Sequence, residues 1–203
     1  VHSLIERIVQ GEVIEISNNP LDYVSGKGYY PTQKTLLQIK KALGSFIAFW
    51  KEQQPEILEM ETLLYSTKKK GDDYMFPFAG RVDMICNIVN PKTSRKEKWL
   101  LDIKTSKQCK GVMNYGLQLS MYTMLYNINN PKSPIERMGI IWAKKDYISP
   151  KPPKSVVAPI EYEFRPELVK AVYTIFQEVY QGFTLGEPKL KEPTPKVFSL
   201  IDD

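Results

Sequence analysis

The sequence has little of what soft-metal sites and membrane spans require. It holds one histidine, His2, and two cysteines, Cys86 and Cys109, among 203 residues. These counts exclude a disulfide framework, a four-thiolate zinc site and an iron–sulfur cluster, and they suit a reducing compartment. No apolar run approaches the roughly 18 residues that a membrane-spanning helix needs, so we expect no membrane partner. Any bound metal would therefore be held mainly by oxygen ligands.

The overall composition is that of one folded domain. Hydrophobic residues make up 42% and charged residues 25% of the chain, which is too short for two ordinary enzyme domains. We therefore expect a single domain over residues 1–203, with an extended tail at 186–203. The 28 lysines and arginines exceed the 23 acidic residues and give a net charge of +5, which favours polyanions but names no partner.

Apolar periodicity and turn residues divide the chain into alternating elements. They predict helices at 3–10, 31–50, 114–127 and from 166 onward, and strands at 56–65, 74–89, 99–104, 137–144 and 160–164. The proline-rich segment 150–159 is predicted to be a loop, and the apolar stripe from Leu168 to Tyr180 is predicted to be core. The order indicates an α/β fold with a small mixed central sheet flanked by helices.

Two acidic residues fall on neighbouring predicted strands. Alternate strand residues share a face, so Asp102 and Lys104 point one way while Leu101 and Ile103 point into the core. A turn centred on residues 92–93 places Asp83 opposite Asp102. Cross-strand Cβ atoms lie about 5 Å apart, where two carboxylates repel unless a cation lies between them. Oxygen ligands without a histidine or thiolate cluster favour Mg²⁺ or Mn²⁺.

A third element follows on the next helix, where Gln118 and Tyr122 are four residues apart on one face. The series Gly80-x-x-Asp83, Asp102-x-Lys104 and Gln118-x-x-x-Tyr122 resembles the RecB-like branch of the PD-(D/E)XK nuclease superfamily. Within that branch it looks most like the mitochondrial genome maintenance exonucleases and related phage exonucleases. The resemblance covers residues 1–126 and implies a restriction-endonuclease-like core. Val82 stands where the superfamily's name has proline.

The resemblance implies roles for particular residues. It makes Asp83, Asp102 and the carbonyl of Ile103 metal ligands, and His2 a further imidazole ligand. Lys104 would position or activate the attacking water and stabilise charge on the phosphate. A lysine beside a dication has a lowered pKa, and metal-bound water ionises near neutral pH, so the chemistry is consistent.

The resemblance also implies supporting residues. Glu61 matches the acidic residue on the strand before the hairpin, with Glu59 as second choice, and Gln118 and Tyr122 would act on the substrate or on the lysine. Each motif also has a plainer interpretation. Asp-x-Lys alone is commonly a surface ion pair, a terminal histidine is commonly solvated, and Gln118 with Tyr122 could be a packing pair.

Basic and aromatic residues elsewhere are weaker candidates for DNA contacts. They are the lysines 68–70, 107, 110, 144 and 145 and the tyrosines 29, 30 and 115. Lysines could neutralise phosphates and tyrosines could stack on bases, although solvated turns and core packing are the usual uses of such residues. Cys86 is expected to be a buried small hydrophobe.

The sequence therefore predicts a Mg²⁺- or Mn²⁺-dependent deoxyribonuclease. The resemblance favours an exonuclease acting on DNA ends, single-stranded or duplex, and leaves the oligomeric state open. The alternatives are a structure-specific or restriction-like endonuclease on the same fold, and a nucleic-acid-binding module without activity. Because the sequence begins at Val1, we expect a processed piece of a longer protein. The expected location is the cytoplasm of a bacterial or phage-infected cell, or an organelle matrix if a transit peptide was removed.

Overall fold

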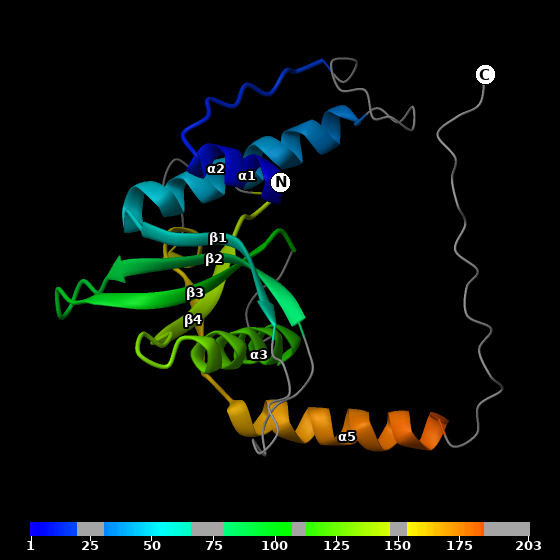
Figure 1. Cartoon of the computed structure of the whole chain (residues 1–203). Coiled ribbons are helices and arrows are strands. Elements are labelled where there is room, and N and C mark those ends of the chain that lie inside the picture. Colours follow the sequence, from blue (N-terminus) through cyan, green and yellow to red (C-terminus); the bar gives the residue numbers. More distant parts are fainter. Residues whose placement is uncertain (20–30, 66–78, 107–112, 147–153, 185–203) are drawn as a thin grey trace, which may run out of the picture. The chain divides into compact units, whose positions relative to one another are not determined.

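A computed structural model gives the fold of residues 1–19, 31–65, 79–106, 113–146 and 154–184. The chain forms two compact units, Val1–Val169 and Lys170–Asp203. Figure 1 shows the elements of the first unit, a sheet with helices on both of its faces. This is the mixed α/β architecture that the sequence predicts.

The sheet has five strands in the order β1-β2-β3-β4-β5. The first three form an antiparallel meander, β4 runs parallel to β3, and β5 is antiparallel to β4. The strands are β1 (Glu56–Tyr65), β2 (Ala79–Val89), β3 (Lys96–Lys104), β4 (Arg137–Trp142) and β5 (Ile160–Tyr162). Strand β3 begins three residues before the predicted start, because the polar arm of the hairpin continues the ladder as far as the pair Val89 and Lys96.

Helices α1 (His2–Val9) and α2 (Gln33–Gln53) cover one face of the sheet, and α3 (Met113–Asn129) covers the other (Figure 1). The side chain of Thr32 caps α2 by accepting a hydrogen bond from the backbone N–H of Thr35 at 3.1 Å. The α2 face is filled by Ile5, Phe46, Phe49, Met84, Cys86, Leu101, Ile103 and Ile141. The α3 face is filled by Val82, Ile85, Leu100, Leu119, Leu125, Met138 and Ile140.

Burial on both faces makes β3 the central strand of the core. Its residues from Trp99 to Ile103 are all buried, including Asp102. The alternation of Leu101 and Ile103 toward one face was predicted correctly, but the opposite face is also covered. Asp102 therefore lies inside the protein, where an ionised carboxylate needs a partner.

The segment between β4 and β5 differs from its prediction. The structure has a short helix, α4 (Lys154–Val157), inside the range 150–159 that the sequence predicts to be a loop. The three prolines of this segment that come before it, at 150, 152 and 153, precede the helix and remove no donor from its interior. Proline content was thus a poor guide to the residues after the prolines.

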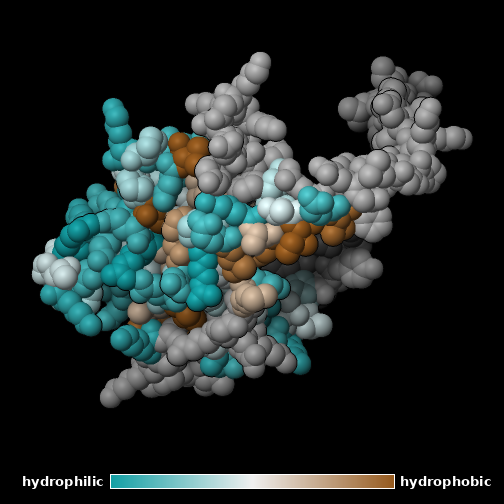
Figure 2. Space-filling model, turned by 90° about the horizontal axis from the view of Figure 1, so that it is seen from below, coloured by the Kyte–Doolittle hydropathy of each residue, from teal (hydrophilic) through white to brown (hydrophobic). Residues whose placement is uncertain are grey.

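Helix α5 (Pro166–Thr184) begins where predicted, but its apolar stripe is not all core. Val169 is buried, whereas Val172, Ile175 and Val179 are 38%, 63% and 51% exposed. Figure 2 shows hydrophobic side chains along this helix on the surface. Helical periodicity identifies an apolar face without showing that anything covers it, and this explains the error. In the part of the chain that the structure describes, no helix is long and apolar enough to cross a membrane.

Candidate functional site

The site begins where the ladder between β2 and β3 stops. The last pair of that ladder joins Met84 to Leu101, so the next step of the same register sets Asp83 opposite Asp102, in agreement with the turn count. At that step the hydrogen-bond acceptor is a side chain instead of a backbone carbonyl. The N–H of Ile103 donates a hydrogen bond to Asp83 Oδ2 at 2.6 Å. The end of the hairpin thereby holds two carboxylates beside each other.

Both carboxylates are shielded from water, and this changes their acidity. Burial raises the pKa of Asp83 to about 6, the nearby negative charge of Asp102 adds to the rise, and the Ile103 N–H and His2 oppose it. Asp102 is only 3% exposed, and burial raises its pKa as well, against the effect of Lys104. One buried and one partly buried acid, both with raised pKa values, form a site that positive charge would stabilise.

Lys104 supplies positive charge from the same strand. Its Nζ lies 2.6 Å from Asp102 Oδ2. Burial by itself would lower the pKa of Lys104, but the hydrogen bond and charge of Asp102 outweigh it, so the pKa lies above its ordinary value. Lys104 is therefore protonated at neutral pH. Among the described residues no other donor reaches Asp102 Oδ2, so the Lys104 ammonium group is its partner, and a carboxylate oxygen can accept more than this one contact.

His2 reaches the same place from the first turn of α1. Its Nε2 lies 2.7 Å from the carbonyl oxygen of Ile103 and 3.7 Å from Asp83 Oδ2. The side chain is 45% exposed, so the imidazole lies at the mouth of the site with one edge toward solvent. The structure thus brings His2, Asp83, Asp102, Lys104 and the backbone of Ile103 together, as the sequence predicts.

Glu61 approaches from β1 through an unusual backbone conformation. It has φ of 49°, in the left-handed region that non-glycine residues rarely adopt, at a cost of about 1–3 kcal/mol. Its charge is near enough to contribute to the raised pKa of Asp83. Its Oε2 also lies 3.0 Å from Arg81 Nε. The strained residue is therefore the one that turns toward the carboxylates.

Glu59, the second choice from the sequence, lies elsewhere. It is opposite Ile85 in the sheet. Burial raises the pKa of Tyr126 on α3, and the charge of Glu59 adds to this rise. The left-handed conformation of Glu61 itself breaks the simple alternation that would have put Glu59 and Glu61 on one face of the strand. The structure thus favours Glu61.

Gln118 and Tyr122 meet on α3, where Gln118 Nε2 donates to the Tyr122 hydroxyl at 3.1 Å. The ring of Tyr122 packs directly on Gly80: a Cβ added there would lie 2.2 Å from Tyr122 Cε1. The glycine of Gly80-x-x-Asp83 therefore leaves room for the tyrosine of Gln118-x-x-x-Tyr122. The two motifs are joined by packing three residues before Asp83.

The residues present suit a hard divalent cation in part. Among the residues that the structure describes, no group of three or more His, Cys, Asp and Glu side chains could hold a metal ion. The available donors are the carboxylates of Asp83 and Asp102, the carbonyl of Ile103 and the imidazole of His2. The unused acceptor capacity of buried Asp102 Oδ2 and the raised pKa of Asp83 both fit a place for Mg²⁺ or Mn²⁺.

An aromatic residue beside Lys104 was missed by the sequence reasoning. Trp142, at the end of β4, pairs with Lys104 across the parallel ladder. The Lys144 Nζ lies 5.1 Å from the centre of the Trp142 ring, and the Lys104 Nζ lies 5.2 Å from that of Tyr115. Only the strand pairing reveals this neighbour. Other predicted DNA contacts lie outside the described residues: Tyr29, Tyr30, Lys107, Lys110 and the lysines 68–70.

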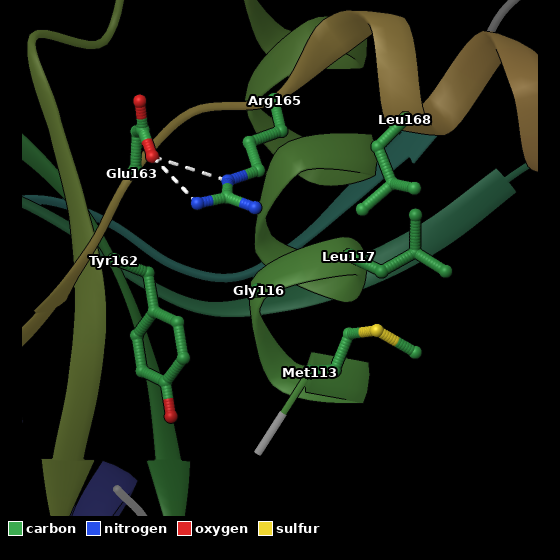
Figure 3. Close-up of a pocket in the computed structure, with 7 residues that line it drawn as sticks. All are labelled: Met113, Gly116, Leu117, Tyr162, Glu163, Arg165 and Leu168. Carbon is green, nitrogen blue, oxygen red and sulfur yellow. Dashed lines mark hydrogen bonds and ion pairs between the residues drawn. The ribbon is translucent and has the colours of Figure 1, made fainter. Parts of the chain in front are cut away.

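A separate pocket lies between α3 and the start of α5 (Figure 3). Its volume is about 230 Å³, and it is lined by Met113, Gly116, Leu117, Tyr162, Glu163, Arg165 and Leu168. An exposed ion pair of 2.8 Å joins Glu163 to Arg165 at its edge. None of the carboxylates described above lines it, and we assign it no function.

Comparisons with known proteins add little to this geometry. No family model matches the chain, and no curated protein matches it. A solved structure described as "Crystal structure of SSO0001" is similar over 70% of this chain and 56% of that chain, with 21% identity and a TM-score of 0.37. A likeness this weak carries no argument about activity. The case for function therefore depends on the site itself.

Proposed function

We propose that the protein is a divalent-metal-dependent DNA exonuclease that hydrolyses phosphodiester bonds at DNA ends, with preference for single strands. The observation that carries the proposal is the pairing of buried Asp102 with partly buried Asp83, with Lys104 Nζ 2.6 Å from Asp102 Oδ2. Phosphodiester hydrolysis needs cationic groups around a phosphate and an activated water.

In this proposal Asp83, Asp102, the carbonyl of Ile103 and His2 would hold Mg²⁺ or Mn²⁺. The bound ion would supply Lewis acidity and a water that ionises near neutral pH. Lys104, protonated in its ion pair, would neutralise charge that builds up on the phosphate. The water would give up one proton as its oxygen forms the new bond to phosphorus, the bond to the leaving sugar oxygen would break, and that oxygen would take up a proton.

Three residues would support this arrangement. Glu61 adds negative charge beside Asp83, which favours a bound cation. Gln118 and Tyr122 hold each other on α3, and the tyrosine ring braces Gly80 on the strand that carries Asp83. We assign them positioning roles, since the described contacts reach the carboxylates only through the strands.

The test is to offer the protein linear DNA and covalently closed circular DNA with Mg²⁺ or Mn²⁺. We expect loss of linear DNA, fastest for single strands, and survival of the closed circle. Cutting of the closed circle would show an endonuclease. Binding without cutting under any divalent cation would show a nucleic-acid-binding module. Either result overturns the exonuclease proposal.

The matched variants are Lys104→Ala and Lys98→Ala. Both remove a lysine from β3, but Lys98 lies at the other end of the strand, where its Nζ contacts Ser133 and the Tyr126 ring. We expect Lys104→Ala to lower the rate at least about 100-fold, the scale seen when a transition-state charge partner is removed. Lys98→Ala should leave the rate unchanged. Equal activity of Lys104→Ala and wild type would remove Lys104 from the site.

A further inference from the structure

Two aromatic rings and two lysines gather at the carboxyl ends of β3 and β4. Trp142 lies beside Lys104 in the parallel register, and Tyr115 is in the first turn of α3. Lys104 Nζ lies 5.2 Å from the centre of the Tyr115 ring, and Lys144 Nζ lies 5.1 Å from that of Trp142. Both rings and both lysines are partly exposed. We call Tyr115, Trp142 and Lys144 the aromatic–lysine cluster.

Ser106 fixes the orientation of both rings. Its carbonyl oxygen accepts a hydrogen bond from Trp142 Nε1 at 2.8 Å, and its hydroxyl accepts one from the Tyr115 hydroxyl at 3.2 Å. The polar atoms of the two rings are therefore engaged with one residue that follows β3. Rings held in this way keep their faces in place, and less side-chain entropy is lost when a planar group stacks on them.

Lys144 is held at its backbone while its ammonium group has a weak partner. Its carbonyl oxygen accepts a hydrogen bond from Ser45 of α2 at 3.0 Å. Its Nζ is 3.6 Å from a carboxylate oxygen of Asp146, whose side chain is 76% exposed. Such an exposed ion pair contributes little. The ammonium group can therefore leave the Trp142 ring for a phosphate at small cost.

We propose that the aromatic–lysine cluster binds one nucleotide of single-stranded DNA next to the scissile phosphate. The base stacks on the ring of Trp142, and Lys144 moves from that ring to the nucleotide's phosphate. This inference deepens the proposed function and rests on it for the position of the scissile phosphate. Because Trp142 pairs with Lys104 in the sheet, the subsite lies beside the carboxylates.

The chemistry of the cluster favours unpaired DNA. Bases inside a duplex are stacked on each other on both faces, so a protein ring reaches a base face only in a single strand or at an end. Stacking on these rings tolerates any sequence, because every base has a π-face, and the lysines bind the DNA backbone. The cluster therefore gives a physical reason for a preference for single strands that the carboxylate site alone lacks.

The test measures binding apart from cleavage. A fluorescently labelled oligothymidylate is titrated with the whole protein in EDTA, so that no phosphodiester bond is cut, and anisotropy gives the Kd. We expect Trp142→Leu to weaken binding by about 5- to 150-fold, the range for loss of one stacked base. Trp142→Phe should keep most of the affinity because it retains a ring.

An abasic strand of the same length separates stacking from a general loss of structure. Wild type and Trp142→Leu should bind the abasic strand equally, since it has no base to stack. If Trp142→Leu weakens binding to both strands alike, or binds the oligothymidylate as tightly as wild type, the inference is overturned. Circular dichroism of Trp142→Phe and Trp142→Leu checks that both variants are folded.

The lysine is tested with a matched control. Lys144→Ala and Lys98→Ala each remove a lysine that lies over an aromatic ring, at 5.1 and 5.7 Å from the centre. Only Lys144→Ala should weaken binding to oligothymidylate. It should also reduce the slope of log K against log salt by about 0.7, the value for one phosphate contact on a single strand. Equal slopes for the two variants would remove Lys144 from the subsite.

These results are distinguishable from failure of the proposed function. If the wild type cuts no DNA, but Trp142→Leu specifically weakens its binding to oligothymidylate, the subsite inference stands and the nuclease proposal fails. If the wild type degrades linear DNA, but Trp142→Leu binds oligothymidylate as tightly as wild type, the nuclease proposal stands and the subsite inference fails. Failure of the wild type to bind any single strand would overturn the subsite outright.

Discussion

The charge on Asp83 should destabilise the fold, and this can be measured without any substrate. Burial and the neighbouring Asp102 raise the pKa of Asp83 from 3.8 to about 6. Between those two values the folded protein binds more protons than the unfolded chain. The free energy of unfolding therefore falls as the pH rises through this window, and it stays at the lower level above it.

The size of the effect follows from the two pKa values. They differ by about two units, and each unit corresponds to about 1.36 kcal/mol, so ionised Asp83 lowers the free energy of unfolding by up to about 3 kcal/mol. Asparagine at this position keeps an oxygen that can accept the Ile103 N–H, and it carries no charge. We therefore expect Asp83→Asn to be more stable than wild type by about 1–3 kcal/mol at neutral pH, without metal.

The assay is urea unfolding of both proteins in EDTA, from about pH 4 to about pH 8. The stability difference should be near zero at the acid end, grow through the window and then remain constant. Asp146→Asn is the matched control, because it makes the same chemical change on a side chain that is 76% exposed. Its difference from wild type should stay small at every pH.

Two results would refute the reasoning. One is a destabilised Asp83→Asn protein at neutral pH, which would mean that the charged hydrogen bond to Ile103 outweighs burial and repulsion. The other is a difference that does not depend on pH. Added Mg²⁺ gives an independent check, because a cation held by both acids should stabilise wild type more than Asp83→Asn.

The remaining predictions concern packing. Gly80→Ala should cost about 1–3 kcal/mol in urea unfolding, because its Cβ would overlap the Tyr122 ring, and Tyr122→Leu in the same chain should recover part of that loss. Cys86 is fully buried and its pKa is raised to about 12, so in a Cys109→Ser background it should react with a thiol reagent only after urea unfolding. Phe46→Ala should cost about 3–5 kcal/mol, since the ring is fully buried against the sheet. Reaction of folded Cys86, or a neutral Phe46→Ala, would contradict the described core.

Local patterns were enough to predict the hairpin of β2 and β3 and its register. The polar turn at residues 92–93 fixes the pairing of β2 with β3 by counting alone, and the observed pairs from Val89 with Lys96 to Met84 with Leu101 confirm it. The count works because a hairpin has one short turn and one register. The prediction that Asp83 faces Asp102 needed no knowledge of the rest of the fold.

Non-local pairing could not be predicted in this way. Strand β4 follows a whole helix and a turn after β3, so sequence spacing does not tell which of its residues will lie beside Lys104. Trp142 was therefore missed, although it is the nearest strand neighbour of the lysine. The exposed residues of α5, Val172 and Ile175 among them, were misjudged because periodicity does not show what covers a face.

The strained and buried features of the candidate site lie close together. Glu61 adopts a left-handed φ, Asp83 has a pKa near 6, and Asp102 is enclosed with part of its acceptor capacity unused. Each of these lowers the stability of the chain by itself, and the core on both faces of β3 must offset them. A cation among the carboxylates would relieve the repulsion and fill the free acceptor position together. These features meet at the end of one hairpin, and this is the physical reason for proposing a cation site there.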